Sequence, residues 1–236
     1  MQPNKLAIFD IDGTLTKTNE IDHLCFIQTT QELISKDFKT FEATTFTHFT
    51  DSCIIVELYE RYLNRQPNKE EIKQFQERYF GLLKHYLTQE PQYFQAIDGA
   101  TSILETLRNN GWAIALATGC WKDSAYIKLK GGGIDIQDTP IGTASDAVTR
   151  QDVMKTALER AKQYYGVNHF AHLVYIGDGL WDRHSCATLK MPFVGVDADN
   201  KDYSTGKLEA FHLLADYNDV ERVQQLLLDA VAPNLD

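Results

Sequence analysis

The sequence contains no apolar run long enough to cross a membrane, and it contains little cysteine. A transmembrane helix needs about 20 consecutive apolar residues, and no stretch of the 236 residues approaches that length. The four cysteines, at positions 25, 53, 120 and 186, lack the spacing of a metal site. We therefore expect reduced thiols in a cytoplasmic protein with no membrane partner. The first residues, Met-Gln-Pro-Asn-Lys, lack the apolar core of a signal peptide, so we expect no such leader.

Positive charge is also scarce. The chain has 23 Lys and Arg residues against 33 Asp and Glu residues, a formal net charge of -10. Non-specific nucleic-acid binding depends on a basic surface, so we expect no nucleic-acid partner. A small anionic substrate remains compatible with this charge, because a metal ion or a single Arg can supply local positive charge. The sequence leaves the oligomeric state open.

Short apolar runs alternate with amphipathic stretches over much of the chain. Repeated strand–helix units of this length predict an α/β fold, in which a Rossmann-like parallel sheet carries helices on both faces. The predicted strands cover residues 6–9, 112–118, 139–144, 172–177, 192–196 and 210–214. The predicted helices between and after them cover residues 99–110, 123–130, 150–165, 180–189 and 218–230.

The segment between the first two strands is different, because helical periodicity dominates it. We predict helices over residues 20–33, with Asn19 as the N-cap, and over 52–64 and 68–87, with a loop over 35–50. This arrangement predicts two domains. Residues 1–16 and 96–236 would form the α/β core, and residues 17–95 would form a small all-helical domain.

The stretch Leu6–Thr16 carries the first chemical signal. An apolar strand ends at two carboxylates, Asp10 and Asp12, followed directly by Gly13. Buried carboxylates are costly unless their charge is compensated, and a divalent cation is the economical candidate. Gly13 permits the sharp turn that must follow. This pattern resembles the first motif, Asp-x-Asp-Gly-Thr, of the haloacid dehalogenase-like (HAD) hydrolase superfamily, which implies that Asp10 is a nucleophile and Asp12 a general acid/base.

Two further stretches resemble later motifs of the same superfamily, in the expected order. Thr118 and Gly119 follow a predicted strand and resemble the second motif, which implies that a hydroxyl and a backbone N–H bind phosphate oxygens. Arg150 begins a predicted helix and resembles the third motif, which implies that it neutralises the phosphoryl group and orients the nucleophile. Lys128 and Lys130 are competing cations, but they lie within the preceding helix and suit this motif less well.

The stretch Gly177-Asp178-Gly179-Leu180-Trp181-Asp182 resembles the fourth motif, Gly-Asp-x-x-x-Asp. The resemblance implies that Asp178 binds a metal directly and that Asp182 binds it directly or through water. Together with Asp10 and the backbone carbonyl of Asp12, they would form an all-oxygen site, which Mg²⁺ prefers. The resemblance covers the whole chain, and it implies that the helical insertion is a cap over the carboxyl ends of the strands.

The resemblance implies a magnesium-dependent phosphatase that hydrolyses a small phosphorylated metabolite through an aspartyl-phosphate intermediate. Asp12 disfavours a dehalogenase, because dehalogenases of this superfamily lack an equivalent acid/base. A sugar-phosphate mutase, a phosphonate hydrolase using Lys36 or Lys39, and a non-catalytic binding protein of the same fold remain alternatives. For substrate selection the candidates are residues 47–51 together with Thr18, Asn19 and Asp22. The seven histidines show no metal-ligand spacing.

Overall fold

A six-stranded parallel sheet forms the centre of the larger part of the molecule. The computed structural model describes residues 3–40, 45–136, 138–198 and 213–234. The strands lie in the order β3-β2-β1-β4-β5-β6 and all run in the same direction. Their bounds are β1 (Lys5–Phe9), β2 (Trp112–Ala117), β3 (Ile141–Gly142), β4 (His172–Gly177), β5 (Phe193–Val196) and β6 (Leu213–Leu214).

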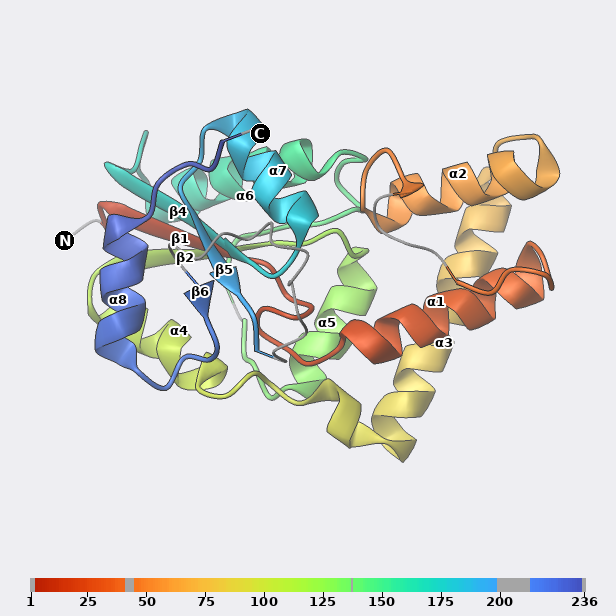
Figure 1. Ribbon diagram of the computed structural model, residues 1–236, viewed down its shortest axis with the longest axis horizontal. Coiled ribbons are helices and arrows are strands. Elements are labelled where there is room, and N and C mark those ends of the chain that lie inside the picture. The colour runs from red at the N-terminus through yellow and green to blue at the C-terminus, as the bar shows by residue number, and fades with distance from the viewer. Residues whose placement is uncertain (1–2, 41–44, 137, 199–212, 235–236) are drawn as a thin grey trace.

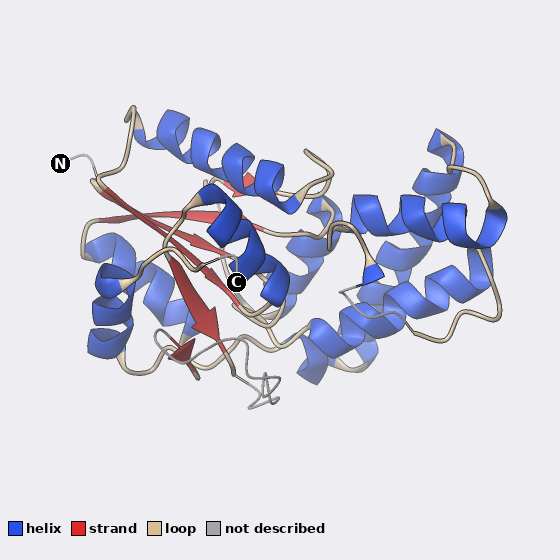
Figure 2. Cartoon of the chain, turned by 45° about the horizontal axis from the view of Figure 1, so that its top comes forward, coloured by secondary structure: helices blue, strands red, loops and turns tan. Residues whose placement is uncertain are grey.

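Helices cover both faces of this sheet, as predicted for an α/β fold (Figure 2). Successive residues of a strand point to opposite faces. Accordingly, Ala7 and Phe9 belong to one hydrophobic cluster and Leu6 and Ile8 to another. The first cluster includes residues of α4 (Ala100–Asn109) and α8 (Val220–Asp229), and the second includes residues of α6 (Arg150–Tyr165) and α7 (Leu180–Leu189). The strands are therefore buried on both sides, which explains their continuous apolar runs.

The sheet brings the ends of β1, β2 and β4 together. Strand β1 lies between β2 and β4, with Phe9 level with Leu116 on one side and with Ile176 on the other. Chain connections run from β1 outward to β2 and β3, then return across β1 to β4. The boundary between β1 and β4 is therefore the switch point of the topology, where open α/β sheets bind their ligands.

The inserted segment is helical, as predicted, and its helices gather at one end of the molecule (Figure 1). It consists of α1 (Asn19–Leu33), α2 (Asp51–Leu63), α3 (Lys69–Gln89) and the short 3₁₀ helix η2 (Pro91–Phe94). Its hydrophobic core includes Phe26, Phe75 and Tyr79, and Trp121 from the sheet-containing part packs among these rings. The two parts of the molecule thus share a packed boundary.

Some predicted boundaries were wrong. Thr18, not Asn19, is the N-cap residue of α1, and the Asn19 side chain is directed to Asp178 instead. The strand predicted over 139–144 is reduced to β3. Pro140 has no N–H to donate, and the Thr143 N–H is bonded to the side chain of Asp146, so the chain leaves the sheet there. Residues 210–212 of the last predicted strand lie outside the described residues.

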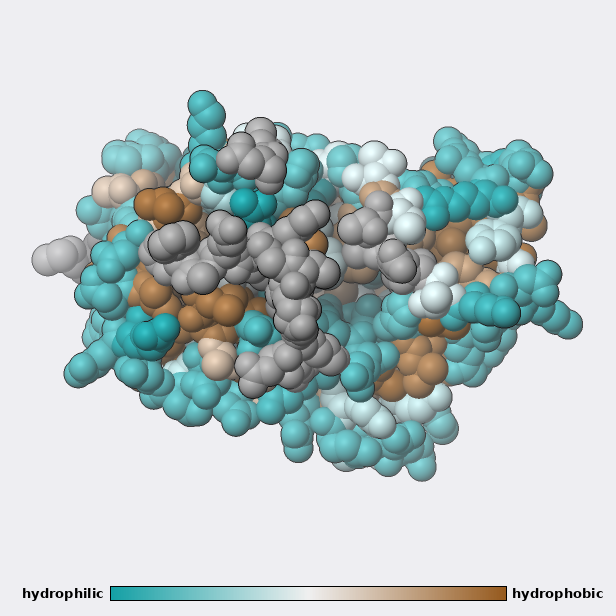
Figure 3. All heavy atoms as spheres, in the orientation of Figure 1, coloured by the Kyte–Doolittle hydropathy of each residue, from teal (hydrophilic) through white to brown (hydrophobic). Residues whose placement is uncertain are grey.

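No helix in the described part of the chain combines the length and apolar character needed to cross a membrane. The face shown in Figure 3 is mostly hydrophilic, with smaller hydrophobic areas on the sheet-containing part and on the helical part.

Candidate active site

Arg150 lies between two buried carboxylates at the carboxyl edge of the sheet. It is the first residue of α6 and is itself buried. Its Nη2 donates to Asp10 Oδ2 at 2.6 Å and to Asp182 Oδ1 at 2.6 Å, and its Nε lies 3.0 Å from the same Asp182 oxygen. One guanidinium thus holds the carboxylate that follows β1 and a carboxylate of α7.

Asp182 is fixed by further contacts. The Tyr175 hydroxyl lies 3.1 Å from Asp182 Oδ1 and 2.9 Å from the carbonyl oxygen of Ala117. The backbone N–H of Gly179 donates to Asp182 Oδ2 at 3.2 Å. Both oxygens of Asp182 therefore accept hydrogen bonds from the protein, and its evident effect in this arrangement is to orient Arg150.

Asp10, Asp178 and Asp182 form a cluster that suits a hard cation. All three are buried, and each offers a carboxylate oxygen within 4.8 Å of the others. Asp10 Oδ1 accepts no hydrogen bond within the described part of the chain. Among the described residues, one guanidinium, that of Arg150, pairs with two of the three carboxylates, Asp10 and Asp182. An oxygen-rich site with excess negative charge fits Mg²⁺.

The pKa values of two of these groups reflect that excess charge. Burial raises the pKa of Asp10 to about 7, with Asp182 adding to the rise and Arg150 opposing it. Burial also raises the pKa of Asp178 well above its usual value, and the neighbouring charge of Asp10 adds to the effect. In the metal-free protein a proton therefore competes for these oxygens near neutral pH.

Asp178 is held by its close approach to the turn after β1. The Asn19 side chain of α1 donates to Asp178 Oδ2 at 2.9 Å. Gly13 adopts a φ of +68°, and a Cβ atom at this position would lie 1.9 Å from the same oxygen. Only glycine therefore fits between these groups, both because of its backbone angle and because of the space.

Asp12 has a separate set of partners on the side that faces the helical insertion. Its Oδ1 accepts from the Thr18 hydroxyl at 2.5 Å, and its Oδ2 accepts from Cys120 Sγ at 2.9 Å and from Lys128 Nζ at 2.9 Å. Burial alone would raise the pKa of Asp12, but the Lys128 charge and these hydrogen bonds hold it below its usual value. Lys128 is fully buried and also pairs with Asp22 of α1.

Thr118 and Gly119 lie at the end of β2, beside Arg150. Thr118 is buried, and its hydroxyl accepts from the Cys120 N–H at 3.2 Å. A Cβ atom on Gly119 would lie 2.5 Å from Arg150 Nη1 and 2.6 Å from the Phe49 carbonyl oxygen. The turn is thus packed closely between the guanidinium and the helical insertion.

The structure thus brings the predicted site residues to one edge of the sheet, with Asp10, Arg150 and Asp182 in direct contact and Asp178 beside them. Sequence reasoning missed Cys120 and Tyr175, and it set Lys128 aside as a weaker candidate for the position of Arg150. A signal for Lys128 was present, because it follows Ala125 by three residues and therefore lies on the same buried face of α5 (Lys122–Gly131). Lys128 does not replace Arg150, since it contacts a different carboxylate.

Several residues suggested for substrate selection lie at the boundary with the sheet-containing part. The Phe49 ring lies 4.3 Å from the Trp181 ring, measured between centroids. The Thr50 hydroxyl donates to the Val148 carbonyl at 2.6 Å, and the Asp51 N–H donates to the Gly119 carbonyl at 2.8 Å. This segment therefore docks the insertion beside the acidic site.

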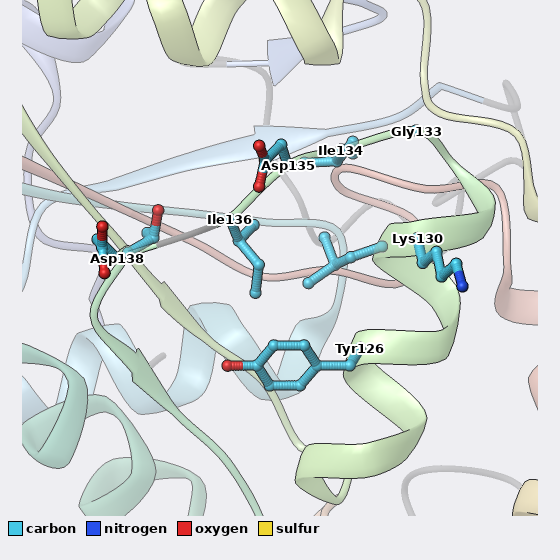
Figure 4. Close-up of a pocket in the computed structure, with 9 residues that line it drawn as sticks. Tyr126, Lys130, Gly133, Ile134, Asp135, Ile136 and Asp138 are labelled. Carbon is cyan, nitrogen blue, oxygen red and sulfur yellow. The ribbon is translucent and has the colours of Figure 1, made fainter.

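A pocket elsewhere on the molecule does not involve these residues. It lies between α5 and the segment 133–139, of which residue 137 is outside the described set (Figure 4). Tyr126, Lys130 and Asp135 are among its lining residues, whereas none of the acidic site residues lines it.

Comparison with known proteins agrees with this geometry. The sequence model of a family described as haloacid dehalogenase-like hydrolase matches residues 7–196, which include most of the first strand, the insertion and all of the site residues above. The chain belongs to this family. It is therefore a HAD-like hydrolase, and the helical insertion after β1 is consistent with the cap of such enzymes.

Solved structures share the fold of this HAD-like hydrolase. A hydrolase from Pseudomonas syringae matches with a TM-score of 0.69 and 20% identity, over 93% of this chain and 99% of the other. A family IA, variant 3 HAD hydrolase from Entamoeba histolytica matches with a TM-score of 0.65 and 16% identity, over 95% and 100% of the two chains. A predicted phosphoglycolate phosphatase from Haemophilus somnus matches with a TM-score of 0.61 and 15% identity, over 95% and 99%. No curated protein sequence matches this chain significantly.

Replacing Arg150 should destabilise the hydrolase strongly. Arg150→Met removes the cation shared by Asp10 and Asp182 and leaves two buried carboxylates without it, which costs about 3–5 kcal/mol. Urea unfolding followed by circular dichroism measures the loss. Lys155→Met on the same helix is the control, because the Lys155–Asp152 pair is exposed and its loss should cost about 1 kcal/mol or less. Equal losses for the two variants would contradict the bridging role of Arg150.

Magnesium should stabilise the hydrolase more at pH 8 than at pH 6. The raised pKa values of Asp10 and Asp178 mean that the metal-free folded state binds protons there which the unfolded state does not. These two groups therefore increase the free energy of unfolding of the metal-free protein as the pH falls from 8 toward 5. A bound cation must displace those protons, so its effect on Tm weakens as the pH falls. Thermal unfolding with and without Mg²⁺ at each pH tests this, and Asp178→Asn should reduce the Mg²⁺ effect at pH 8.

Proposed function

We propose that this hydrolase is a magnesium-dependent phosphatase that acts on a small phosphorylated metabolite through an aspartyl-phosphate on Asp10. The observation that carries the proposal is the placement of Asp10. Its carboxylate is buried beside Arg150 and the other two acids of the cluster, and one of its oxygens accepts no hydrogen bond from the described residues. A carboxylate held in this way can act as a nucleophile once the charge of the substrate is neutralised.

Asp10, Asp178 and the backbone carbonyl of Asp12 would hold Mg²⁺, with Asp182 contributing charge and orienting Arg150. The bound ion would neutralise charge on the phosphoryl oxygens. Arg150, the Thr118 hydroxyl and the Gly119 N–H would bind those oxygens from the protein side. The donors are fixed by the sheet edge before substrate arrives, so little reorganisation is needed during the reaction.

In the first step, an oxygen of Asp10 attacks phosphorus in line and the bond to the leaving oxygen breaks. Asp12 gives a proton to that oxygen, so the product leaves as a neutral alcohol. In the second step, Asp12 takes a proton from water as the water attacks the aspartyl-phosphate. The bond between phosphorus and Asp10 then breaks, and phosphate is released with the Asp10 carboxylate regenerated.

The docked insertion favours a small substrate. Thr50, Asp51 and Ser52 make hydrogen bonds to backbone or side-chain groups of the sheet-containing part. We propose that residues 17–95 act as a cap that excludes water during the reaction and moves to exchange substrate and product. Residues 47–51 with Thr18, Asn19 and Asp22 remain the candidates for contact with the leaving group.

The alternatives fit less well. The side chains of Lys36 and Lys39, which a phosphonate hydrolase would need in its site, are exposed in the loop after α1. A non-catalytic binding protein has no need for an intact set of acids and cations at one sheet edge. A sugar-phosphate mutase shares this set and differs in its product.

Asp10→Asn should abolish turnover and leave the fold intact. The amide cannot act as the nucleophile, so phosphatase activity should fall by at least about a thousandfold. The neutral side chain also removes a carboxylate that burial disfavours, so Tm should change little. Phosphate release and circular dichroism measure the two effects, with Glu159→Gln on exposed α6 surface as the control. Retained activity in Asp10→Asn would refute the assignment.

A screen of phosphorylated metabolites with and without Mg²⁺ should identify substrates that release inorganic phosphate only when the metal is present. The reaction products decide between the two closest functions. An isomerised sugar phosphate formed without net phosphate release would identify a mutase, and no turnover of any compound would contradict an enzymatic role.

A further inference from the structure

A fully buried lysine contacts the residue that we assign as the general acid/base. Lys128 lies on α5, and its side chain has no exposed surface. Its Nζ donates to Asp12 Oδ2 at 2.9 Å and to Cys120 Sγ at 3.0 Å, and it also forms an ion pair with Asp22. Burying a lysine is costly, and these contacts do not involve the nucleophile.

We propose that Lys128 is a positioning residue that fixes the Asp12 carboxylate for proton transfer to the leaving group, and that Asp22 of the insertion holds Lys128 in place. This inference rests on the proposed function, because it needs Asp12 to act as the acid. It adds a residue from α5 and a residue from α1 to the machinery that surrounds the phosphoryl group.

The contacts distinguish the two oxygens of Asp12. Oδ2 accepts from both Lys128 and Cys120, whereas Oδ1 has the Thr18 hydroxyl as its partner. Lys128 and Cys120 hold Oδ2 from one side and Thr18 holds Oδ1 from the other, so the orientation of the Asp12 carboxylate is fixed by contacts at both oxygens. The Thr18 hydroxyl also lies 2.6 Å from the Thr16 hydroxyl, and either can donate to the other. Thr18 therefore ties Asp12 Oδ1 to the segment that leads into α1.

Asp22 completes the arrangement from the insertion. Its Oδ1 is bonded to the Tyr79 hydroxyl of α3 as well as to Lys128. Oxygens of Asp12 and Asp22 lie within 4.8 Å of each other, so without Lys128 two carboxylates would repel across this boundary. In the described part of the chain, Lys128 is the only cation paired with either carboxylate.

Two substrates with different leaving groups can distinguish a positioning role of Lys128 from a purely structural one. An alkoxide needs a proton to leave, whereas p-nitrophenolate leaves without one. The parameter kcat/KM reports steps up to formation of the aspartyl-phosphate, so it excludes the later role of Asp12 with water. The probes are p-nitrophenyl phosphate and the alkyl phosphate that wild-type protein hydrolyses fastest in the metabolite screen.

The main variant is the double substitution Lys128→Met with Asp22→Asn, which removes the cation and one of the two carboxylates together. It is compared with Asp22→Asn alone, because Asp22 is itself a candidate for contact with the leaving group. We expect kcat/KM to fall about a hundredfold or more for the alkyl phosphate and less than about fivefold for p-nitrophenyl phosphate. Lys130→Met, two positions along the same helix and exposed, should leave both values unchanged. Lys128→Arg keeps the charge but not the geometry, and we expect a smaller loss with the same preference for the alkyl substrate.

Circular dichroism and thermal unfolding show whether each variant folds. If the double variant does not fold, the comparison of the two substrates is made with Lys128→Arg instead. Equal losses for the two substrates, or no loss for either, would overturn the positioning role. Failure of the proposed phosphatase function would give a different result from failure of the Lys128 inference. In that case the wild-type protein itself would release no phosphate from any alkyl phosphate with Mg²⁺.

Discussion

The arrangement of the site depends on one shared guanidinium. Arg150 donates to Asp10 and Asp182 from the first turn of α6, and without it these two buried acids would lose the cation that they share. The position at the start of a helix is unfavourable for a cation in terms of the helix dipole. The two carboxylates outweigh that cost, because each interacts with Arg150 where water is excluded.

A second buried cation repeats this design on the other side of the turn after β1. Lys128 pairs with Asp12 and Asp22, as Arg150 pairs with Asp10 and Asp182. The two Asp residues of the first motif are thus separated electrostatically. Asp10, which is buried, has a raised pKa, and Asp12, which is half-buried, has a lowered one, although a single residue separates them in the sequence. Two carboxylates with different surroundings can take different tasks in one reaction.

Much of the fold and part of the site could be predicted because parallel strands impose their own geometry. Asp10, Thr118 and Asp178 each follow a strand, and strands that run in the same direction end at the same edge. Arg150 was predictable from its place at a helix start. Lys128 was harder to assign, since its partner Asp22 lies on another helix, α1, and no local pattern specifies that ion pair. The same holds for Asn19, whose partner lies far away in the chain.

The hydrogen bond between the Asp51 N–H and the Gly119 carbonyl links the start of α2 to the turn after β2. Gly119 is also one of the residues that we propose to bind the phosphoryl group. If α2 moves away from the sheet, its hydrogen bond to the Gly119 carbonyl must break first. The turn at Gly119 would then lose one of its constraints as the insertion opens. Release of phosphate and loosening of the turn that binds it would then occur together.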